Sequence, residues 1–572
     1  MKNIISSAAG REKADIVLKN GKIIDVLGHR IVEGSVGIKD GIILGIGNYE
    51  GEKEIDVKGV YIAPGFVDCH IHIESTMVTP SEFSRLVAPW GVTTVIADPH
   101  EIANVAGEKG LKFMLEDSKN SPVDIEFMLP SCVPATPFDD SGAVIDGDLT
   151  KELLSKYDFK GLGEMMNSVG VVNCDEDIMK KLDCDCIKDG HAPMLEGKAL
   201  NAYVCGGISN DHECSNEKEA LEKVSAGLNI YIRQGTGAKN LDALISAVTP
   251  YNLPHFAFCT DDKHTEEIMK EGTISNCIRL AIEKGFDPIS AYTMASYNGA
   301  MMNRLYDRGA IAPNRIADIV VTEDISAQNI KYVFKNGQLI ASDGKVNFER
   351  VSADSKDVTD TVNIKEMTSE DFKKDFDKNE PVIEIETGSL ITNAVYAESS
   401  QGLSLCANIE RYTGKSSMGK CFLRGFTVEN GAIAQTIGHD SHNISVIGSD
   451  GENMAVAVNA LGKEGGIVVV QDKKVIANMP LPIGGLMSDL DYETVAKEQN
   501  EIVKGAKKIC ENGSSTLLMV LAFVSLLVIP HIKLNSTKNN IKLRCANYIK
   551  KKIVSNNKYY CLKLLWKNIP IY

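Results

Sequence analysis

The segment Pro64-Gly-Phe-Val-Asp-Cys-His-Ile-His-Ile-Glu74 joins a short apolar strand to two closely spaced histidines. Successive side chains of a strand point to opposite faces, so His70 and His72 point to the same face. Both imidazoles can therefore reach one metal ion. An H-x-H pair alone is weak evidence, since a partly solvated strand face can carry the same two residues. Its meaning depends on the sequence around it.

After this segment, apolar runs typical of strands alternate with helical stretches. Residues 93–98, 125–130 and 256–260 are examples of such runs. Fully apolar strands separated by helices indicate a parallel sheet that is covered on both faces. We therefore predict an α/β fold in which residues 61–302 form a (β/α)8 TIM-like barrel. The active groups of such barrels lie at the carboxyl ends of the strands.

Short strands and turns flank the predicted barrel on both sides. Residues 1–60 contain Asn20-Gly21, which predicts a hairpin because both positions tolerate the positive φ of a type I′ turn. A further turn is expected at Lys39-Asp-Gly41. Residues 303–352 have the same rhythm and turn chemistry, as in Tyr332-Val-Phe-Lys-Asn-Gly-Gln-Leu-Ile340. The two segments are therefore expected to form one small β-sandwich module.

The composition changes again beyond the β module. Residues 353–380 are charged and poor in large apolar groups, which predicts a solvated connection. A C-terminal α+β domain is expected over residues 381–534. Its apolar run 517–529 is shorter than the roughly 20 residues that span a bilayer, and predicts a buried strand or core helix. Residues 535–572 form an atypical basic tail, expected to be disordered, since ten Lys or Arg and no Asp or Glu follow residue 530.

The composition also argues against several classes of protein. A formal net charge of -16 speaks against a nucleic-acid partner. Residues 1–13 lack the apolar core of a secretory signal, so a cytoplasmic protein with no membrane partner is expected. The 14 cysteines include no C-x-x-C pair, and the closest spacing, Cys184-Asp-Cys186, suits neither a zinc knuckle nor a redox dithiol. Reduced thiols are therefore expected.

Four further candidate metal ligands each follow a strand-like run: Glu164, His191, His212 and Asp261. Two divalent ions need nitrogen and oxygen ligands and a carboxylate that bridges them, and Glu164 could be that bridge. Each residue also has a structural explanation. Glu164 and Asp261 could cap helices, His191 could sit in a turn, and His212 could be an ordinary surface residue. Together with the H-x-H pair, the set predicts a two-metal site.

Longer motifs connect these residues to a known family. They are Pro64 to Val78, Ala97-Asp-Pro-His-Glu-Ile-Ala-Asn-Val105, Gly163-Glu-Met-Met-Asn167, Tyr231-Ile-Arg-Gln-Gly-Thr236, Phe258-Cys-Thr-Asp-Asp262, Gly438-His-Asp-Ser-His-Asn443 and Pro482-Ile-Gly-Gly-Leu-Met-Ser-Asp489. Through them the chain resembles the bacterial adenine deaminase family of the amidohydrolase superfamily, from about residue 12 to residue 534. The His-Ile-Glu-Ser and Asp-Pro-His-Glu segments are specific rather than generic.

The resemblance implies hydrolytic deamination of adenine to hypoxanthine and ammonia by a metal-activated hydroxide, a reaction of purine salvage. Mn2+ or Fe2+ are the usual metals of this family, and two ions per subunit are expected. Asp261 is expected to carry the proton of the attacking hydroxide to the departing amine. The implied metal ligands are His70, His72, Glu164, His191, His212 and Asp261.

Other polar residues of the same motifs are expected to contact the substrate. His100, Glu101 and Glu74 are three candidates for the group that polarises or protonates the purine ring, and the sequence does not separate them. Arg233 and Ser75 are expected to bind substrate. For Arg233, a surface salt bridge explains the sequence equally well.

Some alternatives stay open at this point. His439 and His442 belong to the family pattern without a known role, and either a turn motif or a lid that reaches the pocket explains them. A related enzyme that hydrolyses a cyclic amide, like dihydroorotase or allantoinase, or that deacetylates an amino sugar, would share the fold, although Glu164 favours the adenine reading. An inactive barrel that serves as a scaffold would lack a ligand, and none is missing. A homodimer is expected from the frequency of symmetric dimers.

Overall fold

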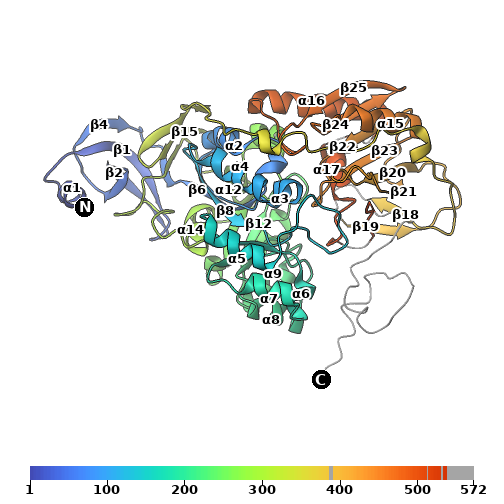
Figure 1. Ribbon diagram of the computed structural model, residues 1–572. Coiled ribbons are helices and arrows are strands. Elements are labelled where there is room, and N and C mark those ends of the chain that lie inside the picture. The colour runs from blue at the N-terminus through green and yellow to red at the C-terminus, as the bar shows by residue number, and fades with distance from the viewer. Residues whose placement is uncertain (386–390, 512, 514, 530–531, 537–572) are drawn as a thin grey trace.

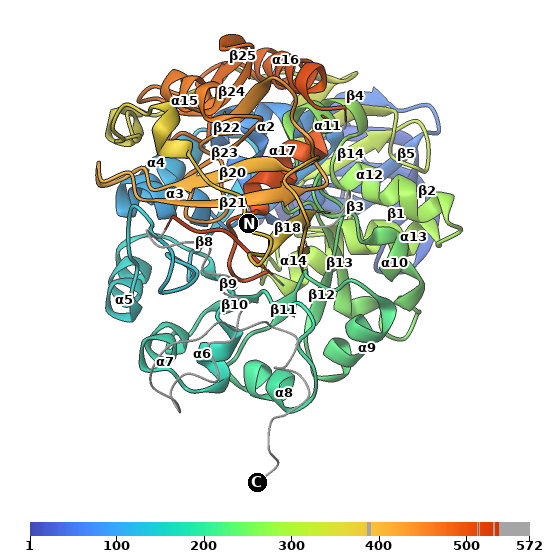
Figure 2. The same cartoon turned by 90° about the vertical axis from the view of Figure 1, so that its right-hand side faces the viewer.

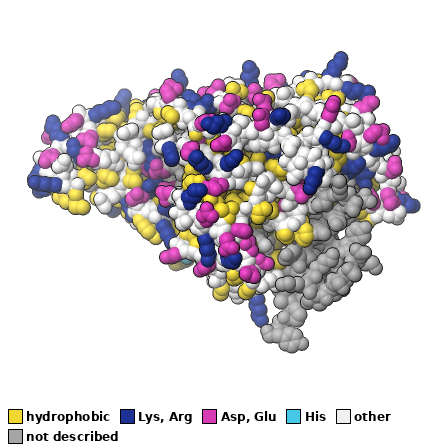
Figure 3. All heavy atoms as spheres, in the orientation of Figure 1, with side chains coloured by type: hydrophobic (Ala, Val, Ile, Leu, Met, Phe, Trp, Pro, Cys, Tyr) yellow, Lys and Arg dark blue, Asp and Glu magenta, His cyan; other side chains and the backbone are white. Residues whose placement is uncertain are grey.

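The computed structural model describes residues 1–385, 391–511, 513, 515–529 and 532–536 (Figure 1). The N-terminal strands lie at one end of the molecule, the barrel lies in the middle, and the C-terminal domain lies at the other end. The tail prediction for residues 535–572 falls, from residue 537 on, outside the described residues. Figure 3 shows acidic and basic side chains interspersed over the visible face, as is usual for a solvated surface.

Eight parallel strands form the central barrel. They are β6 (Phe66–Ile71), β7 (Val92–Ala97), β8 (Asp124–Leu129), β9 (Gly161–Met165), β10 (Ile187–Gly190), β11 (Asn210–Asp211), β12 (Asn229–Arg233) and β13 (Phe256–Cys259). Strands β6 to β10 form one hydrogen-bonded sheet and strands β11 to β13 form another. A parallel bridge between Ile71 and Asp261 joins the last strand to the first, and the Ser209 amide donates to the Lys188 carbonyl across the other seam. The predicted barrel fold is confirmed.

Helices cover the outside of these strands. The barrel helices are α2 (Pro80–Val87), α3 (His100–Ala106), α4 (Glu108–Ser118), α5 (Gly147–Lys156), α6 (Ser168–Val172), α7 (Glu176–Leu182), α8 (Gly197–Cys205), α9 (Glu217–Ser225), α10 (Leu241–Leu244), α11 (Thr265–Glu271), α12 (Ile274–Glu283), α13 (Pro288–Thr293) and α14 (Gly299–Met302). Helix α12 shows why they pack there: Ile274, Cys277, Ile278 and Ala281 recur at helical spacing and are all buried. Such a stripe must lie against a core.

A nine-stranded sheet joins the two ends of the barrel segment. After the short helix α1 (Lys2–Ala8), it contains β1 (Ala14–Asp25), β2 (Arg30–Lys39), β3 (Ile42–Ile46), β4 (Gly51–Asp56), β5 (Tyr61–Pro64), β14 (Ile319–Thr322), β15 (Ile330–Lys335), β16 (Gln338–Ser342) and β17 (Lys345–Val346). Antiparallel pairing of β5 with β14 connects the N-terminal and post-barrel strands. The N-terminal and post-barrel segments therefore share one sheet, and their division from the barrel as a β-sandwich module of residues 1–60 and 303–352 stays a prediction.

The turn predictions in this module had mixed outcomes. Asp40-Gly41 and Asn336-Gly337 are two-residue hairpin loops with positive φ, as expected. The hairpin predicted at Asn20-Gly21 is wrong, because β1 runs straight through it. Asn20 has a φ of 58°, and the register of β1 against β2 shifts between Leu18 and Gly21. A residue that tolerates positive φ suits a β-bulge as well as a turn, and here it forms the bulge.

The C-terminal domain is an eight-stranded sheet with helices on both faces. Its strands are β18 (Val382–Ile385), β19 (Thr392–Val395), β20 (Ser404–Ile409), β21 (Met418–Arg424), β22 (Gly431–Gln435), β23 (Ile444–Gly448), β24 (Gly466–Gln471) and β25 (Lys474–Pro480). Along β24, Val468 and Val470 join the core under α15 (Gly451–Ala460), whereas Ile467 and Val469 join the core that contains α16 (Tyr492–Ile509). Alternation along the strand therefore places the two helices on opposite faces. Figure 2 brings this domain toward the viewer.

The chain between the β module and the C-terminal domain is not the solvated connection that its charge predicted. Val358, Met367 and Phe372 are buried in the hydrophobic cores. A few apolar anchors are sufficient to fix this irregular backbone against folded elements. The expectation for residues 517–529 is confirmed, since helix α17 (Ser515–Phe523) carries buried apolar side chains from Leu518 onward. Among the described residues, no helix combines the length and apolar character needed to cross a membrane.

Candidate active site

The six predicted metal ligands meet at the carboxyl ends of the barrel strands. His70 lies in β6 and Glu164 in β9, and the other four follow strands β6, β10, β11 and β13 within two residues. All six side chains are buried: His70, His72, Glu164, His191, His212 and Asp261. The barrel topology thus brings together residues spread over almost two hundred positions of sequence.

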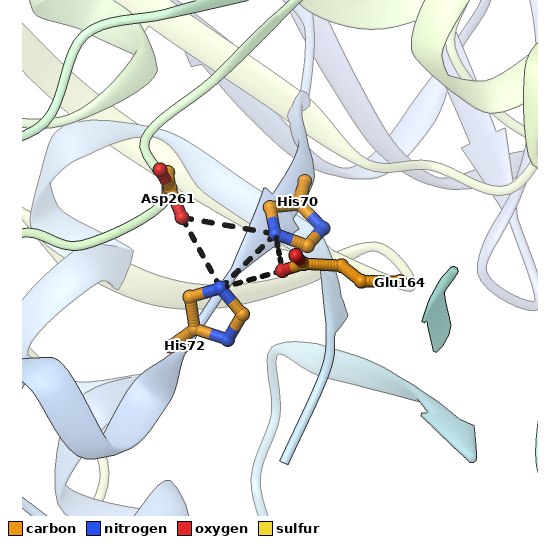
Figure 4. A group of neighbouring side chains, drawn as sticks. All are labelled: His70, His72, Glu164 and Asp261. Carbon is orange, nitrogen blue, oxygen red and sulfur yellow. Dashed lines mark hydrogen bonds and ion pairs between the residues drawn. The ribbon is translucent and has the colours of Figure 1, made fainter. Parts of the chain in front are cut away.

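Four of these side chains converge on one point (Figure 4). Glu164 Oε1 lies 2.8 Å from His70 Nε2 and 2.9 Å from His72 Nε2. The Nε2 atoms of the two histidines are 3.1 Å apart. Asp261 Oδ1 lies 3.1 Å from His72 Nε2 and 3.8 Å from His70 Nε2. Two nitrogen and two oxygen atoms therefore face one another around a small volume.

The second oxygen of Glu164 faces two other histidines. Glu164 Oε2 lies 2.8 Å from His191 Nδ1 and 3.8 Å from His212 Nε2. These three residues also form a group whose ligand atoms could hold a cation. One carboxylate thus lies between two clusters, with one oxygen directed at each, which is the arrangement of a bridging ligand.

Polar contacts behind the histidines set which nitrogen faces the cluster. His72 Nδ1 lies 2.9 Å from the Asp98 carbonyl oxygen, so Nδ1 donates its proton there and Nε2 presents a lone pair to the cluster. His70 Nδ1 lies 3.9 Å from the Asp189 carboxylate. The Asp98 side chain accepts a hydrogen bond from the backbone amide of Glu164 at 2.8 Å. Such outer contacts orient metal-binding histidines.

The charges of this buried cluster compensate one another. Burial alone would raise the pKa of Glu164, but the surrounding histidines, led by His212 and His70, hold it well below its usual value. Burial and the nearby His70 lower the pKa of His212 to about 4. Neither oxygen of Glu164 has a hydrogen-bond partner among the described residues. Buried polar atoms are normally satisfied, so this donor set fits divalent cations.

Arg233 is buried and holds Asp261, so the surface salt bridge considered from the sequence is wrong. Its Nη1 donates to Asp261 Oδ2 at 2.6 Å, and its Nη2 donates to Glu213 Oε2 at 3.1 Å. Asp261 has a φ of 59°, a conformation uncommon for a residue other than glycine. The guanidinium and the backbone together direct Oδ1 of Asp261 toward the histidines.

Glu213 belongs to the site and was missed from the sequence. Its Oε1 lies 3.6 Å from His212 Nε2 and 3.8 Å from His191 Nδ1. The signal was present, since Glu213 directly follows a candidate ligand, but a glutamate after a histidine is common on surfaces. Asp98 and Asp189 were likewise not singled out.

A cavity opens over the cluster and is lined by both domains. Its walls include His72, His100, Glu101, Glu164, Met166, His191, His212, Glu213, Arg233, Gly237, Ala238, Asp261, Asp262, His439, Asp440, Phe523, Leu526 and Ile529. Of the predicted substrate contacts, His100, Glu101 and Arg233 line it directly. The Ser75 hydroxyl instead donates to Asp262, a cavity residue. Glu74 accepts the Ile102 amide at 3.1 Å and is not among the cavity-lining residues of the described chain.

Comparisons with known proteins match both halves of the chain. The model of the amidohydrolase family matches residues 61–340, and the model of the adenine deaminase C-terminal domain matches residues 383–537. The chain is 42% identical to an adenine deaminase of Clostridium acetobutylicum, over 93% of this chain and 96% of that protein. It is 41% identical to an adenine deaminase of Geobacillus kaustophilus, with the same coverage. It is 40% identical to one of Halalkalibacterium halodurans, over 93% of this chain and 94% of that protein.

These matches extend over the barrel and the C-terminal domain together, and both domains line the cavity over the histidine and carboxylate cluster. The chain therefore belongs to the adenine deaminase family, a branch of the amidohydrolases.

Proposed function

We propose that this protein is a metal-dependent hydrolase that converts adenine and water to hypoxanthine and ammonia. The main support for the proposal is the position of the Glu164 carboxylate at the mouth of the barrel. Each of its two oxygens faces a different pair of histidines. Relatives that are named adenine deaminases match the whole of this framework. The enzyme acts on a carbon–nitrogen bond of a cyclic amidine.

Two divalent ions, Mn2+ or Fe2+, fit the donor set. One would be held by His70, His72 and Asp261, the other by His191 and His212, and Glu164 would be shared by both. Nitrogen and carboxylate donors without sulfur suit such borderline and hard ions. Bound there, divalent cations supply a hydrolytic nucleophile near neutral pH, because they lower the pKa of water.

Asp261 is the residue best placed to move protons. Its Oδ1 faces the histidine cluster, while Arg233 holds its Oδ2 at 2.6 Å and so keeps the carboxylate from turning. We assign Asp261 the transfer of the proton from the attacking water to the departing 6-amino nitrogen. A positioned carboxylate of this kind typically contributes about 10²–10⁴-fold to a proton-transfer rate.

Attack at C6 of adenine places negative charge on ring nitrogen N1, so a residue must hold a proton there. His100 and Glu101 line the cavity and are the candidates for this position. Burial, aided by the nearby Glu101, raises the pKa of Glu74 to about 7, so this side chain can also carry a proton, but it lies behind the cavity wall. Ser75 acts through its hydrogen bond to Asp262.

The first experiment follows adenine loss and ammonia release by the purified, manganese-loaded enzyme. His70→Ala removes a candidate ligand and Asp261→Ala removes both a candidate ligand and the proton carrier, while His255→Asn changes an exposed histidine that is not among the residues lining the cavity. Turnover that vanishes in the first two variants and persists in the third supports the assignment. A folded, metal-containing wild type that leaves adenine intact but hydrolyses a cyclic amide such as dihydroorotate contradicts it.

Three further expectations belong to the proposal. Scattered cysteines without a disulfide-like or zinc-like spacing favour a reducing, cytoplasmic setting. The net charge of -16 favours a small-molecule substrate over a nucleic acid. A homodimer is expected from the general frequency of symmetric dimers, and sedimentation tests it.

A further inference from the structure

The C-terminal domain inserts two histidines into the barrel mouth. The loop between β22 and β23, residues 436–443, carries His439 and His442, and both side chains are almost fully buried. Both contact Glu101, at the start of helix α3 in the barrel. This contact joins residues more than three hundred positions apart in sequence.

Each oxygen of the Glu101 carboxylate is held by a different imidazole. Oε1 forms an ion pair with His439 Nδ1 at 2.6 Å, without the angles of a hydrogen bond, whereas Oε2 is hydrogen-bonded to His442 Nε2. His100 Nε2 lies 3.3 Å from Oε1 as well. Two contacts at opposite oxygens fix the plane of a carboxylate, which one contact cannot do.

The backbone determines which nitrogen of His442 carries the proton. The Gly438 amide donates to His442 Nδ1 at 3.3 Å, so Nδ1 is an acceptor. In the neutral ring the proton must then be on Nε2, where it donates to Glu101. A protonated nitrogen has no lone pair for a metal. Although Glu101, His439 and His442 have the spacing of a metal-binding group, this hydrogen bond favours a clamp over a third cation site.

His439 is fixed from the opposite side by helix α17. Its ring stacks on Phe523, with ring centroids 4.2 Å apart and an angle of 16° between the planes. Its backbone amide donates to the Ala522 carbonyl at 2.9 Å. His439, Glu101 and Phe523 all line the substrate cavity. The C-terminal domain therefore lines this side of the cavity and also holds His439 in place.

We propose that His439 and His442 are positioning residues that clamp the Glu101 carboxylate. With its plane fixed, this carboxylate accepts a hydrogen bond from an N–H group of the 6-aminopurine. The inference rests on the proposed function and extends it to the second domain. In this arrangement residues at the ends of the barrel strands would hold the metals, and the orientation of the substrate would depend on a loop of the C-terminal domain. Loss of the clamp leaves the metal ligands in place and lets Glu101 turn.

The two histidines use different ring nitrogens, and this difference gives a sharp test. A glutamine amide nitrogen reaches roughly where Nε2 lies, and an asparagine amide nitrogen roughly where Nδ1 lies. His442→Gln and His439→Asn should therefore keep the donor to Glu101, whereas His442→Asn and His439→Gln should lose it. We expect kcat/KM for adenine to fall about ten- to hundredfold in the second pair and by less than about threefold in the first. All four should keep the metal content of the wild type.

Several outcomes would overturn the clamp. Equal losses in both variants at one position would assign it a purely structural role. Loss of one metal equivalent in each of the four variants would make the histidines ligands. Unchanged kinetics in His442→Asn and His439→Gln would remove any role. Wild-type turnover of adenine reports the proposed function separately.

A second measurement does not depend on turnover. ¹⁵N spectra of the zinc-loaded enzyme with labelled histidine should contain an Nε2–H signal that disappears in His442→Gln. A signal from His442 without a proton on Nε2 would contradict the clamp even if adenine proved to be the wrong substrate.

Discussion

Arg233→Gln should cost both stability and rate, because in the described part of the chain this guanidinium is the one Arg or Lys group that pairs with the buried Asp261 and the half-buried Glu213. Arg233 is 6% exposed, and it binds Asp261 at 2.6 Å and Glu213 at 3.1 Å. Removing one partner of a buried ion pair typically costs about 3–5 kcal/mol, since the remaining charges stay buried. Asp261 would also be free to turn, and a displacement of about 1 Å at a reacting group costs about a hundredfold in rate.

Urea denaturation and kcat measured on the same protein test this prediction. The matched control is Arg30→Gln, which breaks an arginine–aspartate pair of 3.0 Å whose arginine side chain is 70% exposed. An exposed pair contributes about 0–1 kcal/mol, so the control should unfold close to the wild-type midpoint with unchanged kcat. If the two variants lost the same small free energy of unfolding, and kcat stayed at the wild-type value in both, the structural role assigned to Arg233 would be wrong.

Three other predictions address the metal bridge and the C-terminal domain. Glu164→Gln keeps the side-chain shape but replaces one of the two oxygens proposed to bridge the metals. Metal analysis should therefore find at most one ion per chain, and kcat should fall at least about a thousandfold. Two ions per chain with full activity would rule out the bridging role. Asp371 has a pKa lowered to about 2, chiefly by its hydrogen bond to Lys365. Its stabilising effect is complete above the unfolded pKa near 3.9 and is lost as pH falls through about 2, so Asp371→Asn should remove about 1 kcal/mol of stability at pH 7 and flatten the acid limb of the unfolding curve. Phe372→Ala should destabilise the C-terminal domain by about 3–5 kcal/mol in calorimetry, since this ring is fully buried. A change below about 1 kcal/mol would support the original prediction that residues 353–380 form a solvated connection.

The convergence of the six candidate metal ligands could be predicted because each has a local signal. His70 and His72 follow an apolar strand at the spacing that puts both on one face, and Asp261 follows another such strand. Barrel topology converts that local property into proximity, since the carboxyl ends of all eight strands meet. Sequence reasoning was therefore strongest where one structural rule relates position along a strand to position in space.

The errors arose where local chemistry permits two structures. Asn20-Gly21 is compatible with a hairpin turn and with a β-bulge. The pairing of β1 with β4 before these residues and with β5 after them determines that a bulge forms. The charged segment before the C-terminal domain was judged by its average composition, although the burial of Phe372 and two other apolar side chains decides its path. Neither outcome is encoded in the neighbouring residues alone.

The partnership of Glu101 with His439 and His442 lay beyond sequence reasoning for a different reason, because docking of two domains creates it. The barrel alone supplies the six predicted metal ligands, and the C-terminal domain alone supplies His439, His442 and Phe523. On the proposed function, metal binding and substrate orientation depend on different domains. It follows that substitutions in the two domains should separate these functions: barrel variants such as Glu164→Gln lose metal first, whereas variants of the C-terminal loop keep the metal and lose catalytic efficiency. A cavity built this way also couples catalysis to domain docking, since any change that moves the loop away from α3 releases Glu101 without touching a ligand.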